Sequence, residues 1–108
     1  MQVSRYDIFL ANLDPSIGSE INKTRPVVVI SDDLHNRHLK TVVACPLTSS
    51  LHPTWRSRIQ TVCAGQDAEI AVDQIRAISK QRLIKRLDRL SATTAAELRR
   101  VITEMYGG

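Results

Sequence analysis

Two short apolar segments constrain the fold of this chain more than any other feature of its sequence. Val27–Ile30 is a run of four apolar residues, and Thr41–Thr48 is a largely apolar run that ends at a hydroxyl side chain. Runs of this length, bounded by turn-forming residues, are typical of buried β-strands. We expect Pro26 to open the first strand, because a strand's first residue tolerates a missing N–H. Pro46 predicts an edge position or a bulge near the end of the second strand.

The rest of the chain favours more short strands and one longer helix. Five or six strands in succession predict a small antiparallel barrel, with an amphipathic C-terminal helix packed on it. Ile84–Leu90 is ambiguous between strand and helix, and we assign it to a strand. The expected elements are strands at Tyr6–Ala11, Arg58–Val62 and Glu69–Ile78, a short helix over Leu34–Leu39 capped by Asp32-Asp33, a helical turn at Lys80–Leu83, and a helix that starts with a capping box at Thr94–Glu97 and continues with apolar Leu98, Val101, Ile102 and Met105.

Length and composition predict a single soluble domain over residues 1–108. A chain of 108 residues with 43% apolar residues suits one modest core. No apolar run approaches the roughly 20 residues needed to cross a bilayer, so we expect no membrane role. The N-terminal residues lack the long apolar stretch and cleavage site of a secretory signal, which predicts a cytoplasmic protein.

The cysteines and histidines indicate neither a disulfide nor a metal site. Cys45 and Cys63 have no CxxC spacing, and in a reducing compartment we expect both to be buried free thiols. His35, His38 and His52 have no carboxylate or thiol at a usual ligand spacing, so we predict no metal.

The net charge of +4 is concentrated in the C-terminal third of the chain. Residues 1–75 hold seven Lys or Arg against eight Asp or Glu, whereas residues 76–108 hold eight against three. A clustered positive surface attracts polyanions, although a run such as Arg82, Lys85, Arg86 and Arg89 is more often a solvated surface. Charge alone therefore favours a nucleic-acid partner only slightly.

Two strand ends bring together residue types that suit phosphate chemistry. Arg25 precedes one apolar strand and Thr48 ends another, while Glu20 lies in the loop before Arg25. A guanidinium binds non-bridging phosphate oxygens, a threonine hydroxyl donates one more hydrogen bond, and a carboxylate accepts a proton. The alternative is a surface ion pair between Arg25 and Glu20, with Thr48 merely ending its strand. From residue types and spacing alone we favour this alternative.

Four segments, in a fixed order, carry a more specific signal. They are Gly18-Ser19-Glu20 followed by Arg25–Ile30, then Pro46-Leu47-Thr48, then Asp73-Gln74-Ile75-Arg76, and finally Lys80–Leu83. These segments make the chain resemble the MazF/PemK/Kid family of toxin endoribonucleases, and the resemblance extends over nearly the whole length of the chain. The resemblance implies a mainly β (α+β) fold, a small SH3-like antiparallel barrel of the MazF/CcdB type with a C-terminal helix. It also implies a homodimer that cleaves single-stranded mRNA at short sequences without a metal or other cofactor.

The resemblance also assigns roles to positions of this chain. It implies that Arg25 and Thr48 are catalytic and that cleavage yields a 2′,3′-cyclic phosphate and a 5′-hydroxyl. The identity of the general base stays open, with Glu20 as one candidate. The implied RNA-contacting positions are Ile17, Ser19, Glu20, Asp73 and Gln74, and Asn36 matches a position near the dimer interface, where a turn role is an equal alternative. Trp55 either stacks on a base or packs against the barrel.

The expected biological role is that of a toxin in a type II toxin–antitoxin system, which inhibits translation by cutting mRNA. Its expected partner is a small acidic antitoxin whose disordered tail folds across the basic RNA-binding groove. Two alternatives belong to other classes: a CcdB-like poison of DNA gyrase, and a non-catalytic member that binds RNA or antitoxin. Arg25 and Thr48 belong to the nuclease pattern and disfavour both alternatives.

Overall fold

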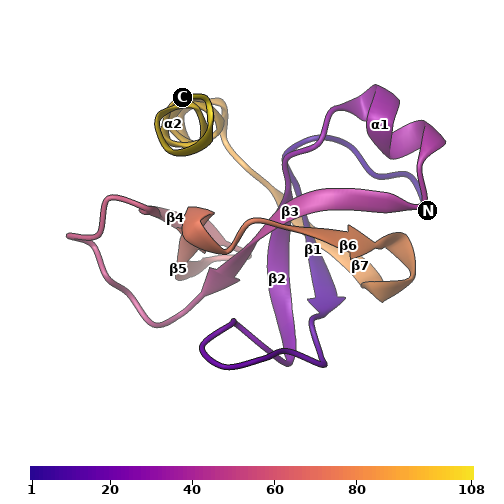
Figure 1. Ribbon diagram of the computed structural model, residues 1–108, viewed down its shortest axis with the longest axis horizontal. Helices are drawn as coiled ribbons and strands as arrows, with labels where there is room; N and C mark the ends of the chain where they lie inside the picture. Colours follow the sequence, from indigo (N-terminus) through magenta and orange to yellow (C-terminus); the bar gives the residue numbers. More distant parts are fainter.

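The computed structural model describes all residues from 1 to 108, and it consists of a curled antiparallel sheet with two helices (Figure 1). There are seven strands rather than the expected five or six. The elements in chain order are β1 (Asp7–Asn12), β2 (Thr24–Val29), α1 (Asp33–His38), β3 (Thr41–Thr48), β4 (Arg58–Cys63), β5 (Gln66–Ala71), the 3₁₀ turn η1 (Val72–Gln74), β6 (Arg76–Ser79), the 3₁₀ turn η2 (Lys80–Arg82), β7 (Leu83–Arg89) and α2 (Ala92–Tyr106).

β3 is the central strand of this sheet. The strand order is β4-β5-β3-β2-β1-β7, and β6 also pairs with β3. The sheet curls so that its two ends approach each other. The Ala64 N–H after β4 donates to the Asp88 carboxylate of β7 at 2.9 Å, which joins the two ends. The protein is therefore mainly β with a half-closed barrel, which agrees with the predicted fold class.

The expectation for Pro26 needs correction, whereas for Pro46 the edge position is wrong and the other expectation, an irregularity in the strand pairing, agrees with the structure. Pro26 is the third residue of β2, where it lies opposite Leu10 of β1. Pro46 does not lie in an edge strand, because β3 is paired along both edges. It lies instead between Ala44, the last residue of β3 paired with β6, and Leu47, the first paired with β5. A residue without an N–H suits the point where a hydrogen-bonded ladder is interrupted.

The segment predicted as one strand over Glu69–Ile78 is divided in two. β5 pairs with the end of β3 and β6 with its beginning, and the three residues of η1 lie between them. The β3–β6 register is offset by three residues from the β3–β5 register, so η1 accommodates residues that the ladder does not pair. Alternation of apolar side chains continues through such an interruption, which is why the sequence pattern did not reveal it.

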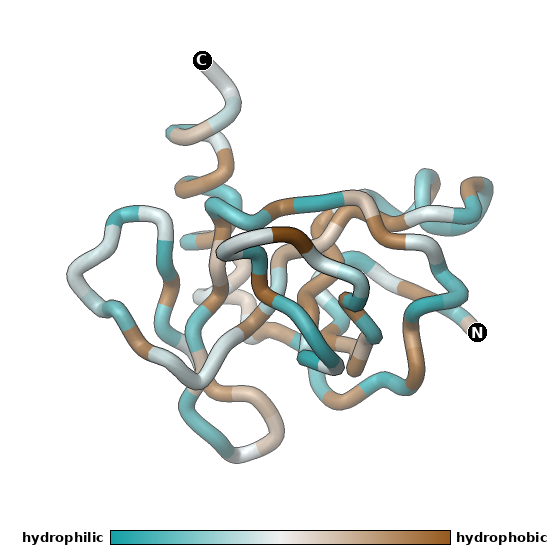
Figure 2. The backbone as a smooth tube through the Cα atoms, turned by 60° about the horizontal axis from the view of Figure 1, so that its bottom comes forward, coloured by the Kyte–Doolittle hydropathy of each residue, from teal (hydrophilic) through white to brown (hydrophobic).

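Two apolar clusters pack on opposite faces of the central strands. Ile8 and Val28 belong to the cluster beneath α2, whereas Phe9, Val27 and Val29 belong to the cluster on the other face. Successive residues of a strand point to opposite faces, so β2 is buried on both sides. Figure 2 accordingly shows hydrophobic stretches of the chain in the middle of the molecule.

The C-terminal helix α2 covers the first of these clusters. Leu98 and Val101 are buried there, with Ile102 and Met105 partly buried beside them, as the periodicity predicted. The predicted capping box at Thr94–Glu97 is wrong, because α2 begins at Ala92. Its cap is Ser91, whose hydroxyl accepts the Thr94 N–H at 3.2 Å. Ser91 follows the buried Leu90 and satisfies this otherwise unpaired N–H, so the helix begins about one turn earlier than predicted.

The other local predictions agree with the structure. Asp32 caps the short helix α1 by accepting the His35 N–H at 2.8 Å. The helical turn is present as η2, and the ambiguous segment is the strand β7. Cys45 and Cys63 are buried free thiols. No helix in the structure is both long enough and apolar enough to span a membrane.

Candidate active site

Arg25 and Thr48 come from neighbouring strands and meet across them. Val27 of β2 lies opposite Pro46 of β3, and Val29 lies opposite Ala44. The same antiparallel register, continued by two residues, puts Arg25 opposite Thr48. Side chains directly opposite in an antiparallel pair share a face of the sheet, with Cβ atoms about 4.5–5.5 Å apart in a regular ladder. Two segments that are 23 positions apart in the sequence thus deliver their polar ends to one place.

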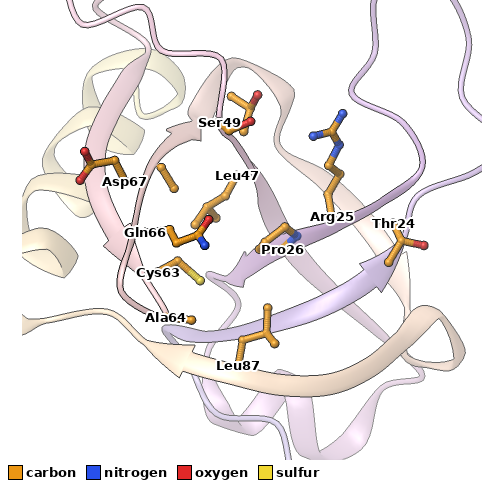
Figure 3. Close-up of a pocket in the computed structure, with 12 residues that line it drawn as sticks. Thr24, Arg25, Pro26, Leu47, Ser49, Cys63, Ala64, Gln66, Asp67 and Leu87 are labelled. Atoms are coloured by element: carbon orange, nitrogen blue, oxygen red, sulfur yellow. The ribbon is translucent and has the colours of Figure 1, made fainter.

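Both residues line a pocket of about 340 Å³, shown in Figure 3. Its apolar side is formed by Pro26, Leu47 and Leu87, and Arg25 stands at its rim. The Gln66 amide points into the pocket from the β4–β5 hairpin. A concave site with an apolar wall and a few convergent polar groups has the usual composition of a ligand-binding site.

The Arg25 guanidinium is free to bind an anion. Its Nε donates to the Asn22 carbonyl oxygen at 3.3 Å, and its terminal nitrogens make no hydrogen bond or ion pair within the chain. The predicted alternative of an ion pair with Glu20 is therefore wrong. Arg25 as a whole residue is half-buried, and the planar donors of its guanidinium match the geometry of a phosphate group.

The Thr48 hydroxyl is held as an acceptor from one side. Its Oγ1 accepts the Ser50 N–H at 3.1 Å. A hydroxyl carries one proton as well as its two lone pairs, so this contact leaves the proton available for a ligand in the pocket. Arg25 and Thr48 together therefore present a cationic fork and a neutral donor to the same volume.

The predicted RNA-contacting residues form a second pocket of about 320 Å³. Ser19, Glu20, Asp73 and Gln74 all line it, and none of them lines the Arg25 pocket. Ile17 belongs to the same loop as Glu20 but does not line the pocket, and its side chain is 83% exposed. The structure thus separates the predicted site residues into two groups.

Two side chains of this second pocket fix the loop between β1 and β2. Glu20 Oε1 accepts the Ile17 N–H at 2.7 Å. Gln74 Oε1 accepts the Ile21 N–H at 2.6 Å, which ties the loop to η1. Glu20 lines the second pocket and Arg25 the first, and the predicted part of Glu20 in proton transfer stays a prediction.

Asn36 has a well-defined structural environment within its own chain. Its side chain is 2% exposed, its Nδ2 donates to the Ser31 carbonyl oxygen at 2.8 Å, and its Oδ1 accepts the Ser31 hydroxyl at 2.5 Å. Lys80 Nζ also donates to the Asn36 carbonyl oxygen. These bonds fasten α1 to the sheet, and a role at a dimer interface stays a prediction.

A largely buried charged network reaches the second pocket through Asp73 and lies opposite Thr48 through Glu69, and it was not predicted from the sequence. Glu69 Oε2 accepts from Arg58 Nη1 at 2.7 Å, and Arg58 Nε donates to Asp73 at 2.9 Å. Burial by itself would raise the pKa of the Glu69 and Asp73 carboxyls, but hydrogen bonds lower both pKa values overall. The donors to Glu69 are Gln60, the His52 N–H and Arg58. At Asp73 the main donor is Arg58. Both carboxylates are therefore held in the charged form.

The two thiols are not activated nucleophiles. Burial, with a smaller contribution from Asp73, raises the pKa of Cys45 to about 12. Cys63 lines the Arg25 pocket, but burial and the nearby Asp88 raise its pKa as well. A thiol with a raised pKa carries little thiolate near neutrality and acts as a small apolar side chain.

Other lining residues were not among the predicted site residues. Ser49 and Gln66 line the Arg25 pocket, and Arg76 lines the second pocket. Arg76 lies within one of the family-like segments, whereas Gln66 sits at the start of β5, and the pairing of β5 with β3 could not be identified from sequence. No group of three His, Cys, Asp or Glu side chains is arranged as a metal site.

Comparisons with known proteins identify the family of this chain and match its fold. A family model described as "PemK-like, MazF-like toxin of type II toxin-antitoxin system" matches residues 4–106. Endoribonuclease EndoA of Bacillus subtilis (strain 168) is 36% identical over 96 residues, which are 83% of this chain and 82% of the relative. Endoribonuclease MazF of Staphylococcus epidermidis is 32% identical over 104 residues, which are 89% of this chain and 84% of the relative.

Solved structures confirm the predicted architecture. MazF (Form-I) from Deinococcus radiodurans superposes with a TM-score of 0.87 at 22% identity, and the match covers 100% of this chain and 99% of that one. An endoribonuclease in complex with its cognate antitoxin, from Mycobacterial species, gives a TM-score of 0.81 at 19% identity and covers 97% of this chain and 95% of that one. Together with a family model that spans nearly the whole chain, these relatives show that the protein belongs to the PemK-like, MazF-like toxins of type II toxin–antitoxin systems.

Proposed function

We propose that this protein is a toxin endoribonuclease that cleaves single-stranded RNA at specific short sequences, and so inhibits translation by cutting mRNA. The observation that carries this proposal is the pairing of an unpartnered Arg25 guanidinium with the Thr48 hydroxyl in one pocket. The relatives named endoribonucleases support it, because they match most of this chain at 32–36% identity.

The proposed reaction is attack of a ribose 2′-hydroxyl on the adjacent phosphorus. The P–O bond to the 5′-oxygen breaks as the new P–O bond forms, which leaves a 2′,3′-cyclic phosphate and a 5′-hydroxyl. One group must accept the 2′-hydroxyl proton and another must protonate the departing 5′-oxygen. The pair of Arg25 and Thr48 supplies a third requirement, which is stabilisation of the negative charge that accumulates on the non-bridging oxygens.

The second pocket suits the reading of bases rather than the chemical step. Unpaired bases leave their hydrogen-bonding edges free, and the pocket holds hydroxyl, carboxylate and amide groups from Ser19, Asp73 and Gln74. Ile17, exposed beside it, adds an apolar contact for a base. We therefore assign phosphate chemistry to the first pocket and sequence selection to the second.

The proposed partners follow from charge and family. The C-terminal third of the chain carries the excess of Lys and Arg, and an acidic antitoxin tail would compete with RNA for this surface. A relative in fold was solved with its cognate antitoxin. We further propose that the toxin acts in the cytoplasm as a homodimer, without a metal or other cofactor.

A single experiment tests the proposal. Purified wild-type protein and Arg25→Ala are incubated with a long single-stranded RNA in excess EDTA, and cut ends are mapped by primer extension. We expect discrete cuts with the wild type only, and end-group analysis should find a cyclic phosphate. Intact RNA with folded wild-type protein would contradict the proposal. Gyrase-dependent DNA breaks would then indicate a gyrase poison, and RNA or antitoxin binding without cleavage a non-catalytic member.

A further inference from the structure

The reaction steps described above assign no part to the buried network around Glu69. Glu69 is fully buried, and the Arg58 side chain is only 7% exposed. Glu69 accepts from Arg58 Nη1 at 2.7 Å, from Gln60 Nε2 at 2.6 Å and from the His52 N–H. A carboxylate of a small domain is rarely buried so completely unless it is paired and hydrogen-bonded.

Glu69 lies one strand away from the proposed catalytic threonine. In the β3–β5 pairing Thr48 is directly opposite Glu69, and in the β4–β5 pairing Gln60 is directly opposite Glu69. Opposite residues share a face of the sheet, so Thr48, Glu69 and Gln60 form one row across three strands, and Arg25 extends it on β2, two residues beyond the last β2–β3 pair. The row begins with the unpartnered guanidinium and ends in the network.

The network also anchors the loop that follows Thr48. The loop spans residues 49–57 between β3 and β4, and Glu69 accepts the N–H of its residue His52. Trp55 stacks on the His52 ring with centroids 3.9 Å apart, and the Arg58 guanidinium lies 4.8 Å from the centroid of the Trp55 ring. The middle of the loop is thus held by side chains rather than by strand pairing.

Arg58 connects this loop to the second pocket. Its Nη1 donates to Glu69 and its Nε donates to Asp73 at 2.9 Å, so one planar group bridges two carboxylates. Asp73 lines the pocket that we assign to base reading. A lysine has a single ammonium and cannot reproduce this fork between two acceptors.

Stability alone is a poor explanation for such a network. Replacing a buried ion pair by apolar residues of similar size is often neutral or stabilising, so burial of charge here suggests a requirement for geometry. We propose that Glu69 and Arg58 are positioning residues for RNA cleavage, which hold the 49–57 loop and set Thr48 and Asp73 relative to each other. This inference rests on the proposed function.

The test uses two changes that keep the site filled. Arg58→Lys keeps a buried positive charge but loses the bridge, and the double change Glu69→Met with Arg58→Met replaces the pair by apolar side chains of similar length. The control is Glu97→Gln on α2, which changes an exposed carboxylate outside the network. Folding is checked by circular dichroism, and kcat and KM are measured well below the melting temperature on an RNA with one cut site.

The only tryptophan of the chain gives an independent readout. Trp55 is 48% exposed and stacked within the network, so its emission and its quenching by acrylamide report the loop directly. We expect stronger quenching in both variants and a fall in kcat of about 10- to 10²-fold, as for small misplacements of catalytic groups. KM should change less than kcat, and Glu97→Gln should match the wild type in every measurement.

The outcomes separate this inference from the proposed function. Wild-type cleavage together with unchanged kcat in both folded variants would overturn the positioning role, even if their melting temperatures fell. Unchanged Trp55 quenching would overturn the claim that the pair holds the loop. A wild-type protein that does not cleave RNA would overturn the proposed function and the role in cleavage, while the Trp55 measurement would still decide whether the pair holds the loop.

Discussion

Two arginines of this protein lie close to one row of side chains, yet their surroundings are opposite. Arg58 is buried and bridges two carboxylates, whereas Arg25 is partly exposed and its terminal nitrogens have no partner in the chain. A cation whose charge is fully satisfied within the fold has a structural or positioning role. A cation left without a partner beside a pocket has its binding capacity available for a ligand. The contrast indicates where the anionic substrate belongs.

Removing the unpartnered arginine should have the largest effect on activity. We expect Arg25→Ala to lower kcat by about 10²–10³-fold, because a charge-stabilising contact to the transition state is lost. Its melting temperature should stay close to that of the wild type, since no internal ion pair is broken. Cleavage of a fluorescent RNA and thermal denaturation measure the two quantities. Near-normal cleavage would reject the assignment of this pocket.

The neighbouring hydroxyl should matter less than the arginine. Thr48→Val keeps the shape of the side chain but removes the donor, and we expect kcat to fall by about 10- to 10²-fold, as for loss of a hydrogen bond to a charged group. Thr48→Ser retains the hydroxyl and should keep most of the activity. Equal activity in the valine and serine variants would show that the hydroxyl is not used.

The Glu69 carboxylate, which is paired with Arg58, should make the stability of the protein depend on pH in the acid range. Hydrogen bonds outweigh burial and lower the pKa of Glu69 from its ordinary value of 4.5, so its charged form stabilises the folded state above that pH. This contribution should disappear as the pH falls below 4.5 through the folded-state pKa. Urea denaturation at a series of pH values should show the loss in the wild type. In Glu69→Gln the pH dependence should be shallower, and an unchanged slope would contradict the role of the carboxylate.

Two basic residues of β7 test the same contrast on the surface. Lys85 is exposed and without a partner, whereas Arg86 Nε donates to Asp7 at 3.2 Å. If basic side chains without an internal partner contact RNA phosphates, Lys85→Ala should make the dependence of the RNA association constant on salt less steep. In a plot of the logarithm of that constant against the logarithm of the salt concentration, the slope should fall in magnitude by about 0.7, the value for one phosphate contact on a single strand. Arg86→Ala should reduce it less. Fluorescence anisotropy with a labelled RNA measures the slopes, and equal slopes in the wild type and Lys85→Ala would make Lys85 an ordinary surface residue.

Local sequence patterns were sufficient for most of the secondary structure. The strand at Val27–Ile30, the cap at Asp32 and the apolar face of α2 could be predicted because each depends on neighbours within a few residues. The failures arose where a local pattern fitted but other contacts outweighed it. The capping box at Thr94 and the single strand over Glu69–Ile78 fitted their patterns, but long-range pairing with β3 and the hydroxyl of Ser91 decided the outcome.

Trp55 shows the limit of reading a side chain by type. The sequence allowed stacking on a base or packing against the barrel. In the structure the ring packs on His52 and lies beside Arg58, while about half of it stays exposed. His52 lies in the loop and Arg58 in the strand that follows, and no local sequence pattern predicts that their side chains meet at Trp55.

The sequence alone was enough to recognise Arg25 and Thr48 as polar residues at the ends of two apolar strands. It was also enough to recognise the family to which the chain belongs. Their meeting in one pocket depends on the β2–β3 register, and the separation of Glu20 from Arg25 depends on how the β1–β2 loop closes on itself. The pairing of Glu69 with Arg58 likewise requires β4 and β5 to be neighbours. Residue types and short-range periodicity are written in the sequence, whereas cross-strand neighbours are set by the packing of the whole sheet.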